Sequence, residues 1–485
     1  MNSNLSQLEP HLIWKNFQAL NAVPRPSKKE ERVIQFMLDF GKELNLETSQ
    51  DAIGNVLIKK PATKGMKDRK TVIIQNHLDM VHQKNNDTIF DFEEEGIKMY
   101  VDGDWVKADG TTLGADNGLG VATSMAILES NEIEHPAIEA IFTVDEETGM
   151  TGAKQLDKTI LSGEVLLNMD TEDDDELTIG CAGGVDTTVS INYEPTQVKT
   201  HAMSLTVKGL KGGHSGMDIN KGLGNANLIL AELIGYLESK VSDFKLIEIE
   251  GGGLRNAIPR EARAVAGAKT LDQVQSLVKA FEETQKAKFS QTEPTLSIQF
   301  ENLGESEVEA LPDDLLSKFL DALLKLPNGV YAMNAEIDDL VETSSNLARV
   351  NVKDGTIELL SLQRSSKEAG KREVAAAYKD IFEGIGADVV HSGDYPGWEP
   401  IAQSPIVKTM RSLYVDLFGD EPHVMACHAG LECGIIGERY PHLEMVSFGP
   451  TIKGAHSPDE RASISSVQKF WRWTLETLKN IPEKD

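Results

Sequence analysis

Five residues of types that bind metal ions stand beside short apolar runs or glycine-rich turns, although they are scattered along the whole chain. These residues are His77, Asp116, Glu147, Asp170 and His456. Two imidazoles and three carboxylates suit a pair of zinc ions, because zinc accepts both nitrogen and carboxylate oxygen ligands. The odd carboxylate can bridge the two ions. A chain that uses all five must fold so that residues 77 and 456 meet.

The segments around these residues alternate between strand-like runs and stretches in which apolar residues recur at helical spacing. Runs rich in β-branched residues at 71–75, 138–144 and 164–168 predict strands, and apolar residues at helical spacing predict helices at 31–46 and 119–128. This alternation predicts an α/β fold, with an α/β/α sandwich around a largely parallel sheet. Binding sites in such sheets lie beyond the carboxyl ends of the strands, and four of the five candidate ligands closely follow a predicted strand.

The middle of the chain has a different pattern. Strands such as 202–208 and 296–300 interleave there with amphipathic helices. The pattern predicts an α+β lid over residues 186–395, built as one lobe or as two similar lobes. The catalytic domain would comprise residues 1–185 and 396–485, and a chain of 485 residues is long enough for two or more such cores.

Composition excludes several classes of partner. The formal net charge of −29 argues against binding to nucleic acid and to anionic membrane surfaces. Three cysteines cannot form a disulfide framework in a chain of this size, and no apolar run approaches the length of a membrane span. The first 20 residues are polar and lack the apolar core of a secretory signal. We therefore expect a cytoplasmic protein.

Two acidic residues beside the candidate ligands, Asp79 and Glu146, can support catalysis without binding metal. Asp79 lies two positions after His77, so an extended backbone would place both side chains on one side, where the carboxylate can accept the second ring N–H and orient the imidazole. Glu146 precedes Glu147, and neighbours on an extended backbone point to opposite faces. Glu147 can then bind metal while Glu146 transfers protons. In isolation, this acidic stretch would fit a solvated turn equally well.

Five short motifs occur together in one known family. They are His77-Leu-Asp79, Gly114-Ala-Asp116-Asn-Gly118, Glu146-Glu147, Asp170 and Gly454-Ala-His456. Over its whole length the chain resembles the zinc metallopeptidase family of carboxypeptidase G, aminoacylase and the cytosolic dipeptidases. Longer phrases, such as Leu210-Lys-Gly-Gly-His-Ser-Gly216 and Leu254-Arg-Asn-Ala-Ile-Pro259, are most similar to its branch of dipeptidases that cleave Xaa-His.

The resemblance implies two zinc ions per chain, for which cobalt or manganese could substitute. It implies that His77, Asp116 and Asp170 hold one ion and that Asp116, Glu147 and His456 hold the other, with Asp116 bridging. Asp79 would orient His77, and Glu146 would be the general base that activates a water molecule.

The resemblance also implies residues that contact the substrate. His214 would donate a hydrogen bond to the developing oxyanion, either from its own chain or across a homodimer formed through the lid. Asn256 and Arg364 would grip the substrate carboxylate, and His428 and Glu432 would line the site in roles that stay open. The implied substrates are small dipeptides with a free amino terminus. The alternatives are an N-acyl amino acid deacylase, an aminopeptidase, or a metal-binding relative without activity.

Overall fold

Two units make up the protein in the computed structural model, which describes residues 4–484. The first unit comprises the chain up to Gly180 together with 398–426 and 431–485, and the second comprises 181–397 together with 427–430. The predicted lid, residues 186–395, falls inside the second unit. The short segment 427–430 also belongs to that unit, which the sequence did not indicate.

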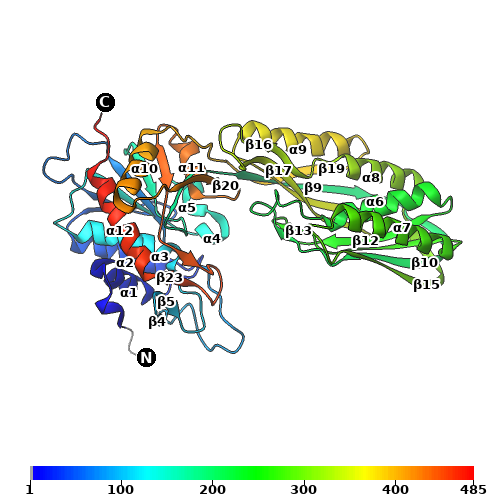
Figure 1. Ribbon diagram of the computed structural model, residues 1–485, viewed down its shortest axis with the longest axis horizontal. Helices are drawn as coiled ribbons and strands as arrows, with labels where there is room; N and C mark the ends of the chain where they lie inside the picture. The colour runs from blue at the N-terminus through cyan, green and yellow to red at the C-terminus, as the bar shows by residue number, and fades with distance from the viewer. Residues whose placement is uncertain (1–3, 485) are drawn as a thin grey trace. The chain divides into compact units, whose positions relative to one another are not determined.

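A mixed sheet of eight strands forms the centre of the first unit (Figure 1). Its order is β1 (Glu47–Gln50), β2 (Val56–Lys60), β6 (Ile138–Thr143), β3 (Val72–His77), β7 (Val165–Asn168), β21 (Glu444–Ser447), β8 (Glu176–Cys181) and β20 (His423–Cys427). The four strands from β6 to β21 run parallel. Every residue of β3, β6 and β7 is buried, and each strand begins with an apolar residue and ends with a polar one.

Helices lie on both sides of this sheet (Figure 1), which confirms the predicted α/β/α sandwich. The helices of the first unit are α1 (His11–Asn21), α2 (Glu31–Glu43), α3 (Ala115–Glu129), α4 (Glu146–Gly149), α5 (Thr151–Gln155), α10 (Pro405–Phe418), α11 (Glu432–Arg439) and α12 (Ile464–Lys479). Helix α3 packs against β3 and is buried from Asn117 to Leu128. Its small residues allow this approach, because a Cβ on Gly120 would lie 2.2 Å from the Asn76 side chain.

A smaller sheet in the first unit positions the last candidate ligand. Its order is β22 (Ile452–Lys453), β23 (Arg461–Ser463), β5 (Trp105–Ala108) and β4 (Met99–Asp102). Strands β22 and β23 form an antiparallel hairpin, and β23 pairs with β5. The hairpin loop carries His456, so this sheet ties a segment near residue 460 to one near residue 105.

One continuous antiparallel sheet forms the second unit, rather than two separate lobes. Its order is β15 (Ser297–Ala310), β10 (Thr196–Lys208), β14 (Ala262–Ala268), β12 (Lys245–Gly252), β17 (Val341–Lys353), β18 (Thr356–Ser365), β9 (Gly183–Asn192) and β19 (Asp388–Tyr395), and β16 (Gly329–Met333) also pairs with β17. Helices α6 (Ala226–Lys240), α7 (Leu271–Lys288), α8 (Asp313–Lys325) and α9 (Glu368–Glu383) contribute to its apolar core. Among residues 4–484, no helix is long and apolar enough to cross a membrane.

Candidate active site

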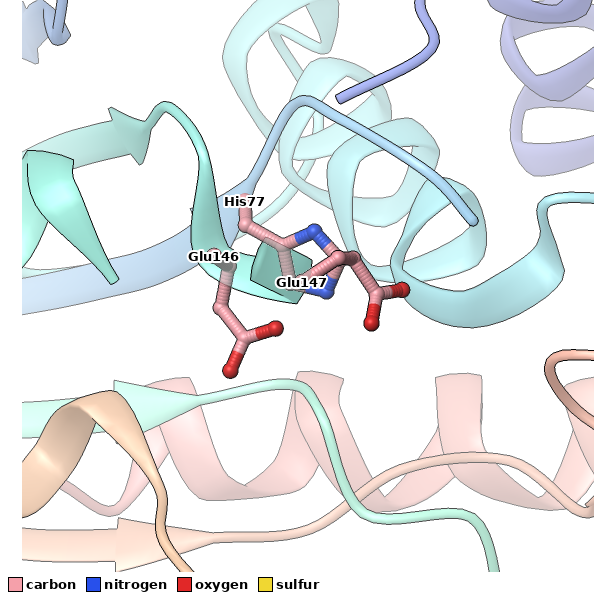
Figure 2. Close-up of side chains that lie close together, drawn as sticks. All are labelled: His77, Glu146 and Glu147. Atoms are coloured by element: carbon pink, nitrogen blue, oxygen red, sulfur yellow. The ribbon is translucent and has the colours of Figure 1, made fainter. Parts of the chain in front are cut away.

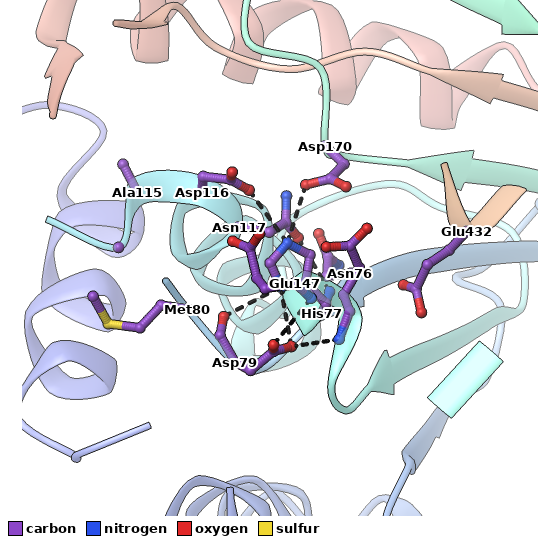
Figure 3. A network of polar contacts seen from close by, with 12 residues as sticks. Asn76, His77, Asp79, Met80, Ala115, Asp116, Asn117, Glu147, Asp170 and Glu432 are labelled. Atoms are coloured by element: carbon purple, nitrogen blue, oxygen red, sulfur yellow. Dashed lines mark hydrogen bonds and ion pairs between the residues drawn. The ribbon is translucent and has the colours of Figure 1, made fainter. Parts of the chain in front are cut away.

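All five predicted ligands gather in the first unit, at the carboxyl ends of the parallel strands (Figure 3). His77 ends β3, Glu147 lies in the first turn of α4 after β6, and Asp170 follows β7 by two residues. Asp116 lies at the start of α3, and His456 comes from the β22–β23 hairpin. The register explains the convergence, because His77 lies beside Thr143 across the parallel strands β3 and β6.

Asp116 lies between the two histidines. Its Oδ1 is 3.2 Å from Nε2 of His77, and its Oδ2 is 3.2 Å from Nε2 of His456. Asp170 Oδ1 lies 3.4 Å from His77 Nε2, and Glu147 Oε2 lies 3.1 Å from His456 Nε2. Two triads of donor atoms thus share Asp116, and within each triad the atoms lie within 4.8 Å of one another.

The carboxylates around the two histidines raise the pKa of both rings, so the cluster favours positive charge. Burial lowers the pKa of His77, but the charge of Asp170 and hydrogen bonds to Asp116, Asp170 and Asp79 outweigh burial, so its pKa is well above the usual value. Hydrogen bonds to Asp116 and Glu147 raise the pKa of His456 to about 11. One carboxylate oxygen of the cluster, Glu147 Oε1, is buried without a hydrogen-bond partner. This donor set fits two divalent cations that accept nitrogen and oxygen ligands.

The side chains of Glu146 and Glu147 point in different directions, as predicted, but the reason differs from the predicted one. They open α4 instead of lying on an extended backbone, and successive helical side chains are turned by about 100°. Figure 2 shows the two carboxylates pointing in different directions beside His77. Burial raises the pKa of Glu146 well above its usual value, and the charges of Asp170, Glu432 and Glu147 add to this effect against the charge of His77.

Asp79 connects His77 to this acidic turn. Its Oδ1 lies 3.4 Å from Nδ1 of His77, whose ring nitrogen is also 3.2 Å from the Asp79 carbonyl oxygen. The same carboxylate accepts the backbone N–H groups of Glu146 and Glu147, at 3.0 and 3.2 Å, and the hydroxyl of Ser27 at 2.8 Å. The sequence predicted the first contact but not the others.

Four of the other predicted residues belong to the second unit. His214 lies on the short strand β11 (Gly213–His214), which pairs with β13 (Ala257–Ile258). Its Nδ1 accepts the backbone N–H groups of Gly216 and Met217, so in the neutral ring the proton is on Nε2. Burial and the charge of Arg364 lower the pKa of His214, against the charge of Asp218. Asn256 is exposed, and its carbonyl accepts the N–H of Ser215.

Arg364 and His428 are both buried in the second unit. Arg364, on β18, is 5% exposed; it donates Nη1–H to the Tyr395 hydroxyl at 2.9 Å, and its Nε has no partner. Within residues 4–484, no carboxylate forms an ion pair with this guanidinium. Burial and the charge of Arg364 lower the pKa of His428 to about 3, and its Nε2 lies 2.7 Å from the Ser344 hydroxyl.

Glu432 belongs to the first unit, unlike those four residues. It opens α11, and its Oε2 accepts hydrogen bonds from Gln75 at 2.7 Å and from Thr143 at 2.6 Å. Its Oε1 is buried without a partner, and burial raises its pKa to about 7 despite the hydrogen bond from Thr143. The carboxylate is thus fixed to β3 and β6, and Figure 3 shows it beside the ligand cluster.

Comparison with known proteins places this site in a family. The model of peptidase family M20/M25/M40 matches residues 73–480, a span that contains all five predicted ligands. The chain belongs to this family. This family member is 42% identical to the cytosol non-specific dipeptidase of Escherichia coli strain K12, over 99% of its own length and 100% of that protein.

Solved structures agree with this assignment. The crystal structure of aminoacylhistidine dipeptidase from Vibrio alginolyticus matches this family member with a TM-score of 0.94 and 41% identity, over 100% of this chain and 99% of that one. Aminopeptidase PepT from Bacillus cereus matches with a TM-score of 0.62 at 17% identity, covering 98% and 99% of the two chains, which shows the shared fold.

Sequence reasoning missed three polar residues around the cluster in this M20/M25/M40 family member. Asn117 accepts the backbone N–H of His77 at 3.3 Å and donates to the Met169 carbonyl at 2.5 Å. Arg25 and Glu460 are buried, and both bind the backbone of the turn that leads into Asp116. For Asn117 and Glu460 the sequence signal was proximity to a predicted ligand, since Asn117 adjoins Asp116 and Glu460 follows His456 by four positions, whereas Arg25 is distant in sequence from every predicted ligand.

Proposed function

We propose that this chain is a two-metal dipeptidase that hydrolyses dipeptides with a free amino terminus, including Xaa-His. The proposal is supported chiefly by the position of Asp116. Each of its two carboxylate oxygens belongs to a different triad of candidate ligands. The full-length similarity to a cytosol non-specific dipeptidase supports the substrate class and a cytosolic location.

The proposed ligands of one ion are His77, Asp116 and Asp170, and those of the other are Asp116, Glu147 and His456. Zinc is the proposed metal, because two imidazoles and three carboxylates suit it, and cobalt or manganese would substitute. When bound, such a pair of ions polarises the scissile carbonyl and lowers the pKa of a water molecule.

Glu146 is the proposed general base. It adjoins the proposed ligand Glu147, its backbone begins α4, and its raised pKa suits a group that both takes and returns a proton. Glu146 would take a proton from the attacking water and give it to the leaving amine. Asp79 would hold Glu146 in place through its backbone N–H and orient His77 at the same time.

The second unit would supply the groups that bind the substrate. The Nε2–H of neutral His214 is a donor for the oxyanion that develops in the transition state. Arg364, buried without a carboxylate partner, would bind the substrate carboxylate together with Asn256, because the guanidinium fork matches a carboxylate. We also propose a homodimer through this unit, which light scattering on the purified protein would test.

The decisive experiment measures histidine release from Ala-His and from its N-acetylated form, using protein loaded with zinc and protein stripped by a chelator. We expect zinc-dependent cleavage of the free dipeptide alone. Cleavage of the acetylated form instead would make the protein a deacylase. If protein that holds two zinc ions per chain cleaves neither compound, the dipeptidase proposal is refuted, but the proposed metal centre is not.

A further inference from the structure

Arg25 is a buried cation whose hydrogen bonds join two segments of the metal site. Its Nη1 donates to the carbonyls of Leu78 and Asp79, each at 3.1 Å, in the segment that follows His77. Its Nη2 donates to the Asn21 side chain at 3.0 Å and to the Gly114 carbonyl at 2.5 Å, two residues before Asp116. The guanidinium thus fixes the distance between the backbones that carry His77 and Asp116.

Glu460 binds the backbone N–H groups of the turn that leads into Asp116. Its Oε2 accepts the backbone N–H groups of Leu113 and Gly114 at 2.7 and 2.9 Å, and its Oε1 accepts those of Ala115 and Asp116 at 2.8 and 3.2 Å. A carboxylate at this position also stabilises the amino-terminal end of α3. Because Glu460 follows His456 by four residues in the β22–β23 hairpin, these four bonds join the His456 loop to the Asp116 turn.

The glycines on either side of Asp116 fit against the guanidinium. A Cβ on Gly114 or on Gly118 would lie 2.6 Å from Nη2 of Arg25. Gly114 also has a φ of +66°, a conformation that glycine adopts without strain. The Gly-Ala-Asp-Asn-Gly motif is therefore shaped by Arg25 as well as by the backbone turn.

We propose that Arg25 and Glu460 are positioning residues that hold the Asp116 carboxylate between His77 and His456 before any metal binds. Their contacts near Asp116 are to the backbone, so their effect on the metals is indirect. Arg25 also offsets the repulsion among Asp79, Asp116, Glu147 and Glu460, whose charges all act on it. The inference rests on the proposed two-metal site, but it concerns the affinity for metal rather than the substrate.

The test measures metal affinity without any substrate. Arg25→Met and Glu460→Gln are stripped of metal and titrated with zinc in competition with a chromophoric chelator, and the visible spectrum of the cobalt-loaded proteins is recorded. We expect both variants to bind metal about 10–100-fold more weakly than the wild type, as is typical when residues that support metal ligands are changed. We also expect an altered cobalt spectrum, and partial recovery of affinity in Arg25→Lys.

Two matched controls separate positioning from general stability. Lys60 is a partly buried cation that donates to the carbonyls of Ile127 and Ser130 at the other end of α3. Glu139 is a buried carboxylate that accepts the backbone N–H groups of Ser162 and Gly163. We expect Lys60→Met and Glu139→Gln to lower the unfolding temperature of the metal-free protein while leaving its metal affinity and cobalt spectrum unchanged.

Three outcomes would overturn the inference. Wild-type affinity and spectrum in Arg25→Met and Glu460→Gln would show that both residues are merely structural, and so would equal losses of affinity in the controls. If Arg25→Met does not fold, Gly118→Ala tests the same contact, and wild-type metal affinity in that variant would contradict the proposal. A wild type that binds no metal would refute the two-metal site itself, whereas one that binds two ions but cleaves no dipeptide would refute only the proposed substrate.

Discussion

His428 allows a quantitative prediction about the stability of the second unit. Its imidazole is buried, its Nε2 lies 2.7 Å from the Ser344 hydroxyl, and burial together with the charge of Arg364 lowers its pKa to about 3. In the unfolded chain the pKa of a histidine is about 6.5. Between these two values the unfolded state binds the extra proton, so the free energy of unfolding falls as the pH falls.

The size of this loss follows from the two pKa values. Lowering the pH from 7.5 to 4.5 protonates His428 in the unfolded state over about two units, at about 1.36 kcal/mol per unit, so His428 should contribute a loss of about 2.7 kcal/mol. We expect His428→Gln to lack this contribution. Its stability relative to the wild type should therefore rise by about that amount between pH 7.5 and pH 4.5.

Urea unfolding of metal-free wild type and His428→Gln at both pH values measures the difference. His201→Gln, which removes an exposed histidine from β10 of the same unit, is the control and should follow the wild type. Replacing Arg364 by Met should raise the pKa of His428 and shrink the effect, because the guanidinium charge favours the neutral ring. The reasoning is wrong if His428→Gln has the same pH dependence as the wild type, or if NMR shows His428 titrating near 6.5.

Three further predictions concern the site. Glu146→Gln should lower kcat by about 10²–10⁴-fold while the protein retains two metal ions per chain, and loss of metal in that variant would contradict its role as a base. Arg364→Met should lower kcat/KM for a dipeptide by about 10–150-fold, the cost of about 1.5–3 kcal/mol for a charge-assisted hydrogen bond. A dipeptide amide, which lacks the carboxylate, should be cleaved equally by both proteins. Asp79→Asn should weaken zinc binding by about 10–100-fold in a chelator competition, because His77 loses its orienting carboxylate, and unchanged affinity would show that Asp79 supports only the α4 turn.

The sequence was informative where a residue's surroundings follow from strand periodicity. The strands β3, β6 and β7 are fully buried and begin with apolar residues, so polar residues that end them, such as His77, were conspicuous. Parallel strands then place these ends at one edge of the sheet. The fold class and the gathering of the five ligands could be predicted for this reason.

The remaining features depend on contacts that leave no local pattern. Arg25 and Glu460 contact the turn that carries Asp116 through backbone carbonyls and N–H groups, which any sequence provides, so only the folded chain reveals these contacts. The sequence predicts an extended turn after β6, whereas in the structure Glu146 begins a helix. The attachment of residues 427–430 to the second unit, beside Ser344, likewise depends on packing between segments far apart in the chain.

The order of the ligands along the chain has a consequence for synthesis. His77, Asp116 and Asp170 precede the second unit, and so does Glu147, whereas His456 follows it. On the ribosome one proposed triad of ligands is therefore complete nearly three hundred residues before the other, a delay of about 14–60 s at 5–20 residues per second. If the proposed two-metal site is correct, a nascent chain would present a single mononuclear site while the second unit is made, and the second metal site would be completed only when His456 has been added.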